Sequence, residues 1–406
     1  MANTTIEPLW VARDVQRVAK NETRFIRNVQ KKLSDEFIVS GTKVGGTVGV
    51  RLAQRLVTTK GQGIQLQNIQ DTVVYVTITD QANIAWGWSS REGTLNIQDT
   101  RERYVNPAGT QLANTADKDG LSRLYQDIYF SQGTPGTTPS ANTVYFAAAD
   151  DLTQIAAVPK DSRNMLVNST MGTAIANANL ALFNLGSSKN VLEDGMLSAG
   201  ALKWKEWWED NNIYPHTYGT YAGTPLVKGA SQTGSTLATD GWSSGASTLN
   251  KGDVFTIGSG ATAVKGVNVQ SYQDSGLPQK FVVTATTSDV SGEMLTLAIA
   301  PSIITSGAYQ TVVASPADNA TINVVGSSAV TSMQGLGYHK DAFVMASADL
   351  ILPNQGKAER VRAPGSGMSL RLWEASDIMT DQHPTRLDWI YGFKTIRADW
   401  AVRIQA

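Results

Sequence analysis

The first hydrophobic pattern in the chain has the spacing of an α-helix. Over residues 11–37, apolar side chains recur three, four or seven positions apart, and basic side chains occupy most positions on the opposite faces. The pattern predicts a helical arm with a locally basic surface, which is either a solvated face or a face that packs on a neighbouring subunit or DNA. The apolar positions are Val11, Val15, Val18, Phe25, Val29, Leu33 and Phe37.

Residues 47–80 change to the alternation that is typical of β-strands. The segments TVGVRLAQRLVTT, IQLQNIQ and DTVVYVTIT follow one another, with a turn at Lys60-Gly61-Gln62-Gly63 after the first. IQLQNI alternates apolar residues with glutamine, which suits a strand with one face in water. We expect a long hairpin with little core of its own, which needs another surface to lie against. The strand after it should place Trp86 and Trp88 on one face.

A second helix is predicted over residues 107–130. Asn106 is a suitable N-cap, and Pro107 suits the first helical position. The helix should end before residues 131–141, a loop rich in glycine, proline and threonine. One stripe of the helix is apolar and is formed by Leu112, Ala116, Leu124 and Ile128.

Residues 144–217 mix helix and loop. The segment MGTAIANANLALFNLG predicts a helix of small residues that stops at Gly186. LKWKEWWEDNN places Trp204 and Trp208 one helical turn apart. We interpret these two tryptophans as a packing stripe on a helix rather than as a ligand site.

The pattern changes again between residues 218 and 330, where Gly, Ser, Thr and Val dominate and few residues are charged. Short strands separated by turn clusters predict a small all-β module, either a barrel or a compact sandwich, inserted into a host domain. Residues 331–406 return to the aromatic-rich and more charged composition of residues 80–217, which indicates the host domain. There SLRLWEA places Leu370 and Leu372 on one side of a strand. The last segment, RLDWIYGFKTIRADWAVRIQA, predicts two strands that complete a sheet. Trp389, Tyr391 and Phe393 should share one face of it.

The length, charge and composition of the chain exclude several classes of protein. With 406 residues the chain is too long for one core, so two to four structural units are expected. The formal net charge of −1 argues against a free nucleic-acid binder, and the absence of cysteine excludes disulfides and thiolate sites. The start of the chain lacks the apolar core of a signal peptide, and no apolar run approaches a bilayer span. We therefore expect a soluble protein made in a reducing cytoplasm, with no membrane partner.

The search for chemistry assigns no catalytic, cofactor-binding or metal-binding residue. Asp377, Asp381 and His383 lie close in sequence and could hold a cation, but a solvated turn explains them better. Residues 117–120, Asp-Lys-Asp-Gly, are similar to the middle of a calcium loop, yet the register would need acids where Thr115 and Gln126 stand. Dinucleotide, P-loop and nucleophile-elbow motifs are also absent. A structural role is therefore favoured over an enzyme.

Three stretches resemble coat proteins of short-tailed phages of the Salmonella lambdoid type. These are residues 112–141, with the helix and the loop after it, residues 249–258, LNKGDVFTIG, and residues 390–404, IYGFKTIRADWAVRI. The order and spacing of these three stretches agree with those in the coat proteins over nearly the whole chain. One departure is that Pro and Glu often follow the arginine in such coats, whereas Ala398 and Asp399 follow Arg397 here. The acid is kept and the proline is not.

The resemblance implies an α+β fold of the tailed-phage major capsid type, first described in phage Hong Kong 97, with a small all-β insert. It implies an N-terminal arm, an extended β-hairpin loop, a peripheral domain with a long spine helix, an axial domain, and the insert. The corresponding residues are 1–46 for the arm, 47–83 for the hairpin loop, 84–217 for the peripheral and first axial part, 218–330 for the insert, and 331–406 for the rest of both domains.

The same resemblance implies a function and partners. The chain would be the major capsid protein, which assembles as pentamers and hexamers into an icosahedral shell around double-stranded DNA. Its partners would be other copies of itself, a scaffolding protein, a portal vertex, packaged DNA on the inner surface and, as a further candidate, a decoration protein. Assembly would take place in the host cytoplasm, and the product would be the virion capsid. The alternative is a carbohydrate-binding or adhesion module, suggested by the Ser/Thr/Gly-rich region.

Overall fold

The computed structural model describes most of the chain. The described residues are 13, 15–17, 23–31, 47–58, 60–61, 66–67, 72–89, 106–180, 200–243, 245, 247–288, 293–362 and 367–406. The chain divides into two compact units. The first contains Met1–Leu52, Val73–Gly120 and Phe343–Ile396, and the second contains Ala53–Thr72, Leu121–Ala342 and Arg397–Ala406. The fold is mixed α and β and rich in strands, as the sequence predicts.

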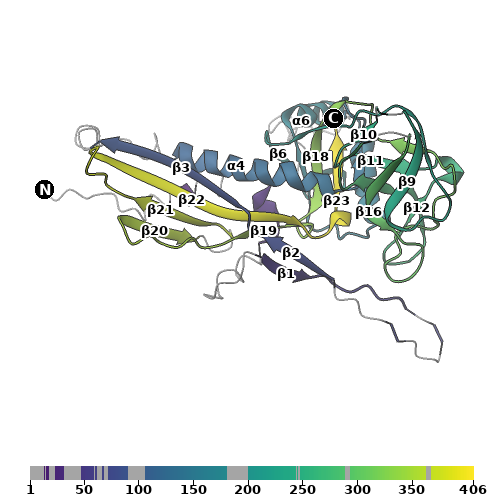
Figure 1. Cartoon of the computed structure of the whole chain (residues 1–406), viewed down its shortest axis with the longest axis horizontal. Helices are drawn as coiled ribbons and strands as arrows, with labels where there is room; N and C mark the ends of the chain where they lie inside the picture. Colours follow the sequence, from purple (N-terminus) through teal and green to yellow (C-terminus); the bar gives the residue numbers. More distant parts are fainter. Residues whose placement is uncertain are drawn as a thin grey trace. The chain divides into compact units, whose positions relative to one another are not determined.

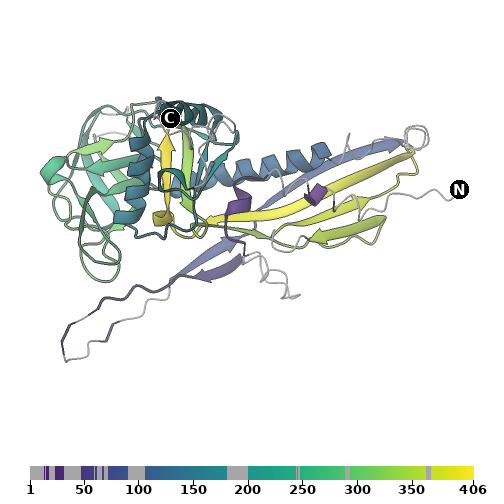
Figure 2. The same ribbon diagram turned by 180° about the vertical axis from the view of Figure 1, so that it is seen from behind.

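The first unit is built on one antiparallel sheet (Figure 1). Its order is β19-β22-β21-β20, and β3 pairs with the free edge of the long strand β22. The front and back views both show α4 running along this sheet (Figure 2). The bounds are β3 Asp80–Ser89, α4 Asn106–Leu124, β19 Phe343–Ser347, β20 Lys357–Arg362, β21 Ser369–Glu374 and β22 Gln382–Thr395.

The aromatic face predicted for the closing segment is confirmed. The ring centroids of Trp389 and Tyr391 lie 4.9 Å apart, and those of Tyr391 and Phe393 lie 5.6 Å apart. The Tyr391 hydroxyl donates to Asp119 Oδ2 of α4 at 2.6 Å. This places Asp119 in a hydrogen bond within the unit instead of in a calcium loop.

The predicted stripes are also buried. The four apolar positions of α4 and the residues after it are at most 3% exposed, and the two leucines of β21 are fully buried. These residues are Leu112, Ala116, Leu124, Ile128, Leu370 and Leu372. The helix begins at Asn106 and is followed by a short 3₁₀ turn, η3 Tyr125–Asp127.

The continuous helix predicted over residues 11–37 is wrong in its central part. Residues 15–17 are helical, but a bend follows at residue 24 and then only a 3₁₀ turn, η1 Ile26–Asn28. Two interactions stop the helix from continuing. The Asp117 carboxylate accepts hydrogen bonds from the backbone N–H of Arg24 and Ile26, at 2.8 and 2.9 Å. Phe25 is fully buried beside Phe343, so tertiary packing overrides the local periodicity. Val11, Val18, Leu33 and Phe37 lie outside the described residues.

The root of the predicted hairpin is a short antiparallel ladder. β1, Thr47–Arg51, pairs with β2, Val73–Thr77, so that Thr47 stands opposite Thr77. Val76 is fully buried in a small core with Val344 and Ala346. The hairpin is expected to have little core of its own and to lie against another surface, and at its root that surface is the unit's own sheet. Most of the predicted strand IQLQNIQ lies outside the described residues.

The second unit contains a mixed central sheet with the order β4-β23-β18-β5-β6, and β7 pairs with the far part of β18. The pairs β23/β4 and β5/β6 are parallel. Two helices, α5 Asn142–Gln154 and α6 Ser169–Leu180, contribute to the apolar core on one face of this sheet. The strands are β4 Phe130–Gln132, β5 Arg163–Val167, β6 Glu206–Glu209, β7 Pro215–Thr217, β18 Thr331–His339 and β23 Ala401–Gln405. The predicted helix end at Gly186 lies outside the described residues.

The helix predicted around Trp204 and Trp208 is wrong. After a 3₁₀ turn, η4 Ala201–Lys203, this segment forms strand β6, which pairs in parallel with β5. Gly200 has φ of 83°, a left-handed conformation that turns the chain into the strand. Trp204 is fully buried, and a Cβ on Gly337 would lie 2.5 Å from its Cη2 atom. Pairing with a buried strand thus overrides the helical spacing of the tryptophans.

The two closing strands belong to different sheets, so the expectation that they complete one sheet is wrong. β22 lies in the sheet of the first unit and β23 in the central sheet of the second. A 3₁₀ turn, η6 Ala398–Trp400, separates them. Arg397 stacks on Trp400, with its Cζ 4.3 Å from the ring centroid.

Residues 223–324 contain a β-barrel with a core of its own. The strand order is β17-β11-β14-β16-β9-β8, and a bridge between Leu226 and Thr321 joins the two edge strands. The all-β pattern predicted for this region is thus confirmed as a barrel. Its strands are β8 Gly223–Val227, β9 Gly234–Trp242, β11 Val254–Ile257, β14 Lys280–Val283, β16 Leu295–Ile303 and β17 Ile322–Val324. Two short pairs complete the region: β10 Thr248–Leu249 with β15 Thr287–Ser288, and β12 Lys265–Val267 with β13 Asp274–Pro278.

Candidate functional site

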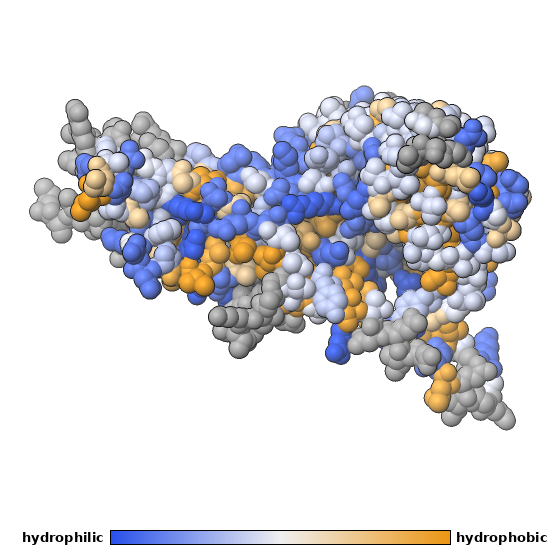
Figure 3. Space-filling view, in the orientation of Figure 1, coloured by the Kyte–Doolittle hydropathy of each residue, from blue (hydrophilic) through white to orange (hydrophobic). Residues whose placement is uncertain are grey.

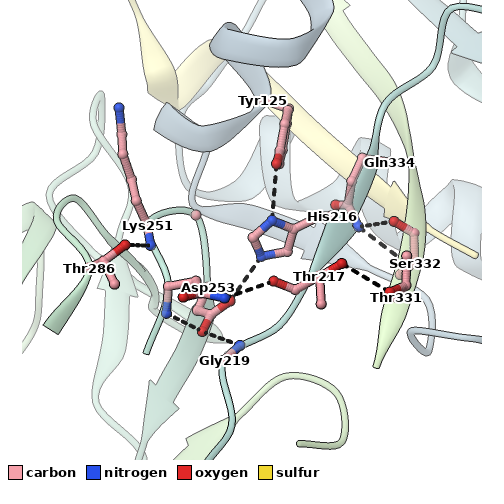
Figure 4. A network of polar contacts seen from close by, with 12 residues as sticks. Tyr125, His216, Thr217, Gly219, Lys251, Asp253, Thr286, Thr331, Ser332 and Gln334 are labelled. Atoms are coloured by element: carbon pink, nitrogen blue, oxygen red, sulfur yellow. Dashed lines mark hydrogen bonds and ion pairs between the residues drawn. The ribbon is translucent and has the colours of Figure 1, made fainter. Parts of the chain in front are cut away.

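A buried polar network lies where the barrel region joins the central sheet of the second unit (Figure 4). His216 of β7 is at its centre. Its Nε2 lies 2.8 Å from Asp253 Oδ1, and its Nδ1 lies 3.0 Å from the Tyr125 hydroxyl. All three residues are at most 4% exposed. Both ring nitrogens of His216 are therefore occupied by partners inside the protein.

Asp253 also organises the turn that leads into the barrel. Its Oδ2 accepts hydrogen bonds from the backbone N–H of Gly219 at 3.0 Å and of Asn250 at 2.8 Å. In Figure 4, dashed lines reach the Asp253 side chain from His216 and from Gly219. The buried Asp253 carboxylate thus connects three segments: strand β7, the chain that follows it at Gly219, and the turn at Asn250 before β11.

A buried arginine, Arg403, lies next to this polar network. Arg403 of β23 is fully buried and donates from Nη2 to the Gly252 carbonyl at 2.7 Å. Its Cζ lies 5.9 Å from the ring centroid of Tyr125. Burial lowers the pKa of Arg403, and the neighbouring Tyr218, Tyr125 and Asp253 oppose that change.

The His216–Asp253 pair has the chemistry of a proton-relay dyad, but its setting is structural. The third member, Tyr125, is a buried phenol, and burial raises the pKa of this group. A general base has to reach a substrate proton, and these atoms are covered by the protein. The network therefore holds the barrel in place. Sequence reasoning missed His216 and Asp253, although Asp253 lies within the stretch LNKGDVFTIG that carries part of the resemblance.

A second buried ion pair joins the barrel to the same sheet. Lys280 Nζ of β14 lies 2.8 Å from Asp151 Oδ2 of α5 and donates to the Ser131 carbonyl at 2.6 Å. The side chain of Gln132 donates to the same Asp151 oxygen at 2.8 Å. Lys280 and Asp151 are both largely buried, so the pair fixes the orientation of β14 on the sheet edge.

The hairpin continues beyond its β1–β2 root into an arm, residues 53–58, which belongs to the second unit. Arg55 Nη2 lies 3.0 Å from Asp399 Oδ2, and Gln54 Oε1 accepts from the Tyr309 hydroxyl at 3.2 Å. Burial raises the pKa of Asp399, while the charges of Arg55 and Arg397 lower it. The arm is thus anchored to its own chain before it extends further.

Residues 212–404 match the family described as "P22 coat protein - gene protein 5". The chain is thus similar to phage coat proteins over nearly half of its length. It is a major capsid protein, the structural subunit that forms the phage shell. The matched region begins just before β7 and includes the whole barrel, β18 and almost all of β23.

Several solved structures align with this coat protein along most of its length. That of Mycobacterium phage Che8 has a TM-score of 0.47 and 14% identity, covering 94% of this chain and 90% of its own. The capsid of Ralstonia phage GP4 has a TM-score of 0.46 and 11% identity, with 95% and 90% covered. The capsid of cyanophage P-SCSP1u has a TM-score of 0.41 and 11% identity, with 88% and 82% covered. A comparison with curated protein sequences gives no match.

The surface of the coat protein carries large apolar side chains in separate places. On the face drawn in Figure 3 they form several patches instead of one continuous surface. In the hairpin, Leu56 is 64% exposed and Leu66 is 95% exposed. Ile378 and Met379 in the turn between β21 and β22 are 94% and 88% exposed. Such residues are candidates for contacts with other molecules.

The candidate cation cluster of the coat protein is a turn. Asp377 accepts hydrogen bonds from the Met379 N–H at 2.9 Å and the Thr380 hydroxyl at 2.7 Å, and these bonds lower its pKa. His383 Nδ1 lies 2.9 Å from the Ser376 hydroxyl, so its ring faces the turn. Across the described residues, no three His, Asp or Glu side chains are grouped as a metal site would require. No described helix combines the length and apolar character needed to cross a membrane.

Proposed function

We propose that this coat protein assembles as pentamers and hexamers into an icosahedral shell around the double-stranded DNA of a tailed phage. The observation that carries the proposal is the family match over residues 212–404, which includes the barrel and the closing strands. The virion capsid is its location. Assembly would take place in the host cytoplasm.

The arrangement of the elements supports a Hong Kong 97-type fold. We assign residues 1–46 to the N-terminal arm, 47–83 to the extended loop, 84–217 to the peripheral domain and first axial part, 218–330 to the insert and 331–406 to the remainder. The long helix α4 lies along a long-stranded sheet, as a spine helix would. The self-contained barrel core supports the insert, since all its buried members fall between Val227 and Ile322.

The hairpin supplies a physical reason for assembly. Its root is packed and its arm is anchored, yet Leu56 and Leu66 remain in water. Covering apolar surface of this size on a neighbouring copy contributes about 25 cal/mol per Å², which gives only a few kcal/mol per contact after the cost of association. Many weak contacts together stabilise a closed shell. Because each contact is weak, a wrongly placed subunit can still dissociate. A scaffolding protein, a portal vertex and a decoration protein are the further partners we propose, with packaged DNA on the inner surface.

Electron microscopy of the purified chain tests the proposal. The full chain is expressed with and without its scaffolding protein, and negatively stained samples are examined for closed shells. Shells or capsomer rings are expected in at least one sample. A strictly monomeric chain under both conditions would contradict the proposal.

A pair of variants tests the part played by the hairpin. Leu56→Asp with Leu66→Asp should abolish shells while leaving the melting temperature of the subunit unchanged, because both side chains are exposed. Met294→Asp is the matched control, since this apolar side chain is 52% exposed but lies at the barrel strand β16. If the hairpin variant still formed normal shells, the hairpin leucines would not be part of the assembly contacts.

A further inference from the structure

Strand β23 has one apolar and one polar face, and both faces are buried. Val402 and Ile404 point into the apolar core that α5 and α6 help to form. Arg403 and Gln405 alternate with them, so they point to the opposite face, and both are fully buried. A strand with two buried faces is expected to be apolar on both. The polar face of β23 therefore calls for a physical explanation.

The neighbouring strands add polar side chains to this same face. Ser131 of β4 stands in register with Arg403, and Gln334 of β18 stands opposite Gln405. Residues in register on adjacent strands share a face of the sheet. Tyr218, from the segment that enters the barrel, joins them: burial raises the pKa of its phenol, while the nearby charge of Arg403 and a hydrogen bond with the Gln334 side chain partly offset this. All of these side chains are at most 3% exposed.

Several of these polar atoms lack partners within the described part of the chain. Nη2 of Arg403 donates to the Gly252 carbonyl, the amide nitrogen of Gln334 donates to Ser332, and the Tyr218 phenol pairs with the Gln334 side chain. Buried polar groups are almost always hydrogen-bonded, and a group without a partner is more costly than a hydrogen bond is favourable. The atoms without a partner are Ser131 Oγ, Arg403 Nε and Nη1, and Gln405 Nε2 and Oε1.

We propose that this layer is a built site for a small cluster of buried water molecules between the central sheet and the barrel. The chemistry favours water over an ion. Arg403 and the Gln405 amide nitrogen offer donors, while the side-chain carbonyl oxygen of Gln405 offers an acceptor. Water can serve both kinds of group at once, whereas an anion would serve the donors alone.

The water cluster has a consequence for how the barrel is held. The barrel meets the core through apolar residues on one side, where Val254 and Val282 join the core cluster. On the other side it rests on the polar layer and on the His216–Asp253 network. Hydrogen bonds through water are nearly as favourable as direct ones, so the water cluster adds to the attachment that the network provides on this side. This inference does not depend on the proposed shell geometry.

A structure of the full chain at a resolution that shows water tests the site. Several ordered water peaks are expected within hydrogen-bonding distance of Arg403 Nε, of both polar side-chain atoms of Gln405 and of Ser131 Oγ. Direct pairing of these side chains with one another, with no peaks between them, would overturn the proposal. A single dense peak on Arg403 that exchanges with bromide would also overturn it, because the site would then hold an anion.

A substitution at Gln405 distinguishes a polar layer that holds water from one that does not. Gln405→Leu removes two unpaired atoms from a dry layer and should then raise the melting temperature. In a hydrated layer the same change breaks water contacts, so we expect a lower melting temperature and loss of the adjacent water peaks. Gln273→Leu, at an exposed position, is the control and should change neither. If Gln405→Leu does not fold, Ser131→Ala makes the same distinction with one hydroxyl.

Discussion

Arg55, in the arm of the hairpin, binds Asp399, in the turn before the last strand, with Nη2 and Oδ2 3.0 Å apart. Asp399 is the acid kept at the position where the coat proteins that this chain resembles have Pro and Glu. The structure shows what the acid does here: it anchors the hairpin arm. The side chains of Arg55 and Asp399 are 28% and 16% exposed, so the pair is only partly screened by solvent.

We therefore predict that Arg55→Gln frees the arm. Residues 53–58 should become sensitive to limited proteolysis, with a loss of about 1 kcal/mol in the free energy of unfolding. Lys265→Gln is the matched control, because Lys265 and Asp274 form a more exposed pair at 3.3 Å. That variant should leave proteolysis and stability unchanged. Equal protection of the arm in both variants would show that Arg55 does not anchor it.

Much of the fold could be predicted from local patterns in the sequence. The buried stripe of α4, the aromatic face of β22 and the all-β insert were all legible, because each depends on a periodicity of two or 3.6 within one element. The failures have a common cause. Phe25 and Asp117 interrupt the first helix, and Trp204 leads into a strand next to β5, so contacts between distant segments override the local signal.

The buried network could not be predicted for a similar reason. His216, Asp253 and Arg403 are far apart in the sequence, and none belongs to a recognisable spacing. The hint was that Arg403 interrupts an apolar closing strand, but its partners are set by the pairing of β23 with β18 and β4. Only the topology brings Gly252 and Tyr125 to this arginine.

Removing the central carboxylate should be strongly destabilising. Asp253→Ala takes away acceptors from Gly219, Asn250 and His216, and it removes one nearby negative charge that favours the charged form of Arg403. We expect a loss of roughly 3–5 kcal/mol in the free energy of unfolding, measured by chemical denaturation. Asp318→Ala is the control: Asp318 accepts from the Gly229 N–H at 2.7 Å, but it does so at an exposed site. A similar loss in both variants would contradict the role given to the network.

The packing of Trp204 against β18 depends on a glycine. A Cβ on residue 337 would lie 2.5 Å from Cη2 and 2.9 Å from Cζ3 of Trp204, so Gly337→Ala should cost about 1–3 kcal/mol through overpacking. Gly172→Ala is the opposite case, since the nearest atom to the new Cβ, on Val167, is 3.9 Å away and the residue lies in α6. That change should be neutral or stabilise by about 0.5–1 kcal/mol. Tryptophan fluorescence during urea unfolding measures both, and a neutral Gly337→Ala would refute the packing argument.

The barrel should fold as an isolated fragment. Its core is formed within residues 227–322, and its strand pairs β8–β9, β11–β14 and β14–β16 each join barrel strands that follow one another along the chain. A fragment of residues 218–330 loses His216 and Arg403 but keeps this core. We expect a β-type circular dichroism spectrum and a cooperative thermal transition below that of the full chain. A disordered spectrum would show that the junction is needed for folding.

His339 should make the stability of the coat protein depend on pH. The residue is 5% exposed, its ring packs edge-on against Trp400 at 4.8 Å, and its Nδ1 accepts from the Asp341 N–H at 3.3 Å. Burial lowers its pKa below the ordinary value of 6.5, and this outweighs the opposing charge of Asp341. The folded state therefore binds fewer protons than the unfolded state as the solution becomes acidic. The stability that His339 contributes is present above pH 6.5 and is lost as the pH falls through the lowered pKa.

The matching experiment compares the wild type with His339→Gln, which keeps an acceptor for the Asp341 N–H but cannot be protonated. At pH 8 the variant is expected to be less stable because the contact with Trp400 is reduced. Between pH 7 and pH 5 the wild type should lose more stability than the variant, at about 1.4 kcal/mol for each unit by which the folded pKa lies below the unfolded one. Urea unfolding at each pH measures the difference. Parallel curves for the two proteins would mean that His339 is not the group that titrates.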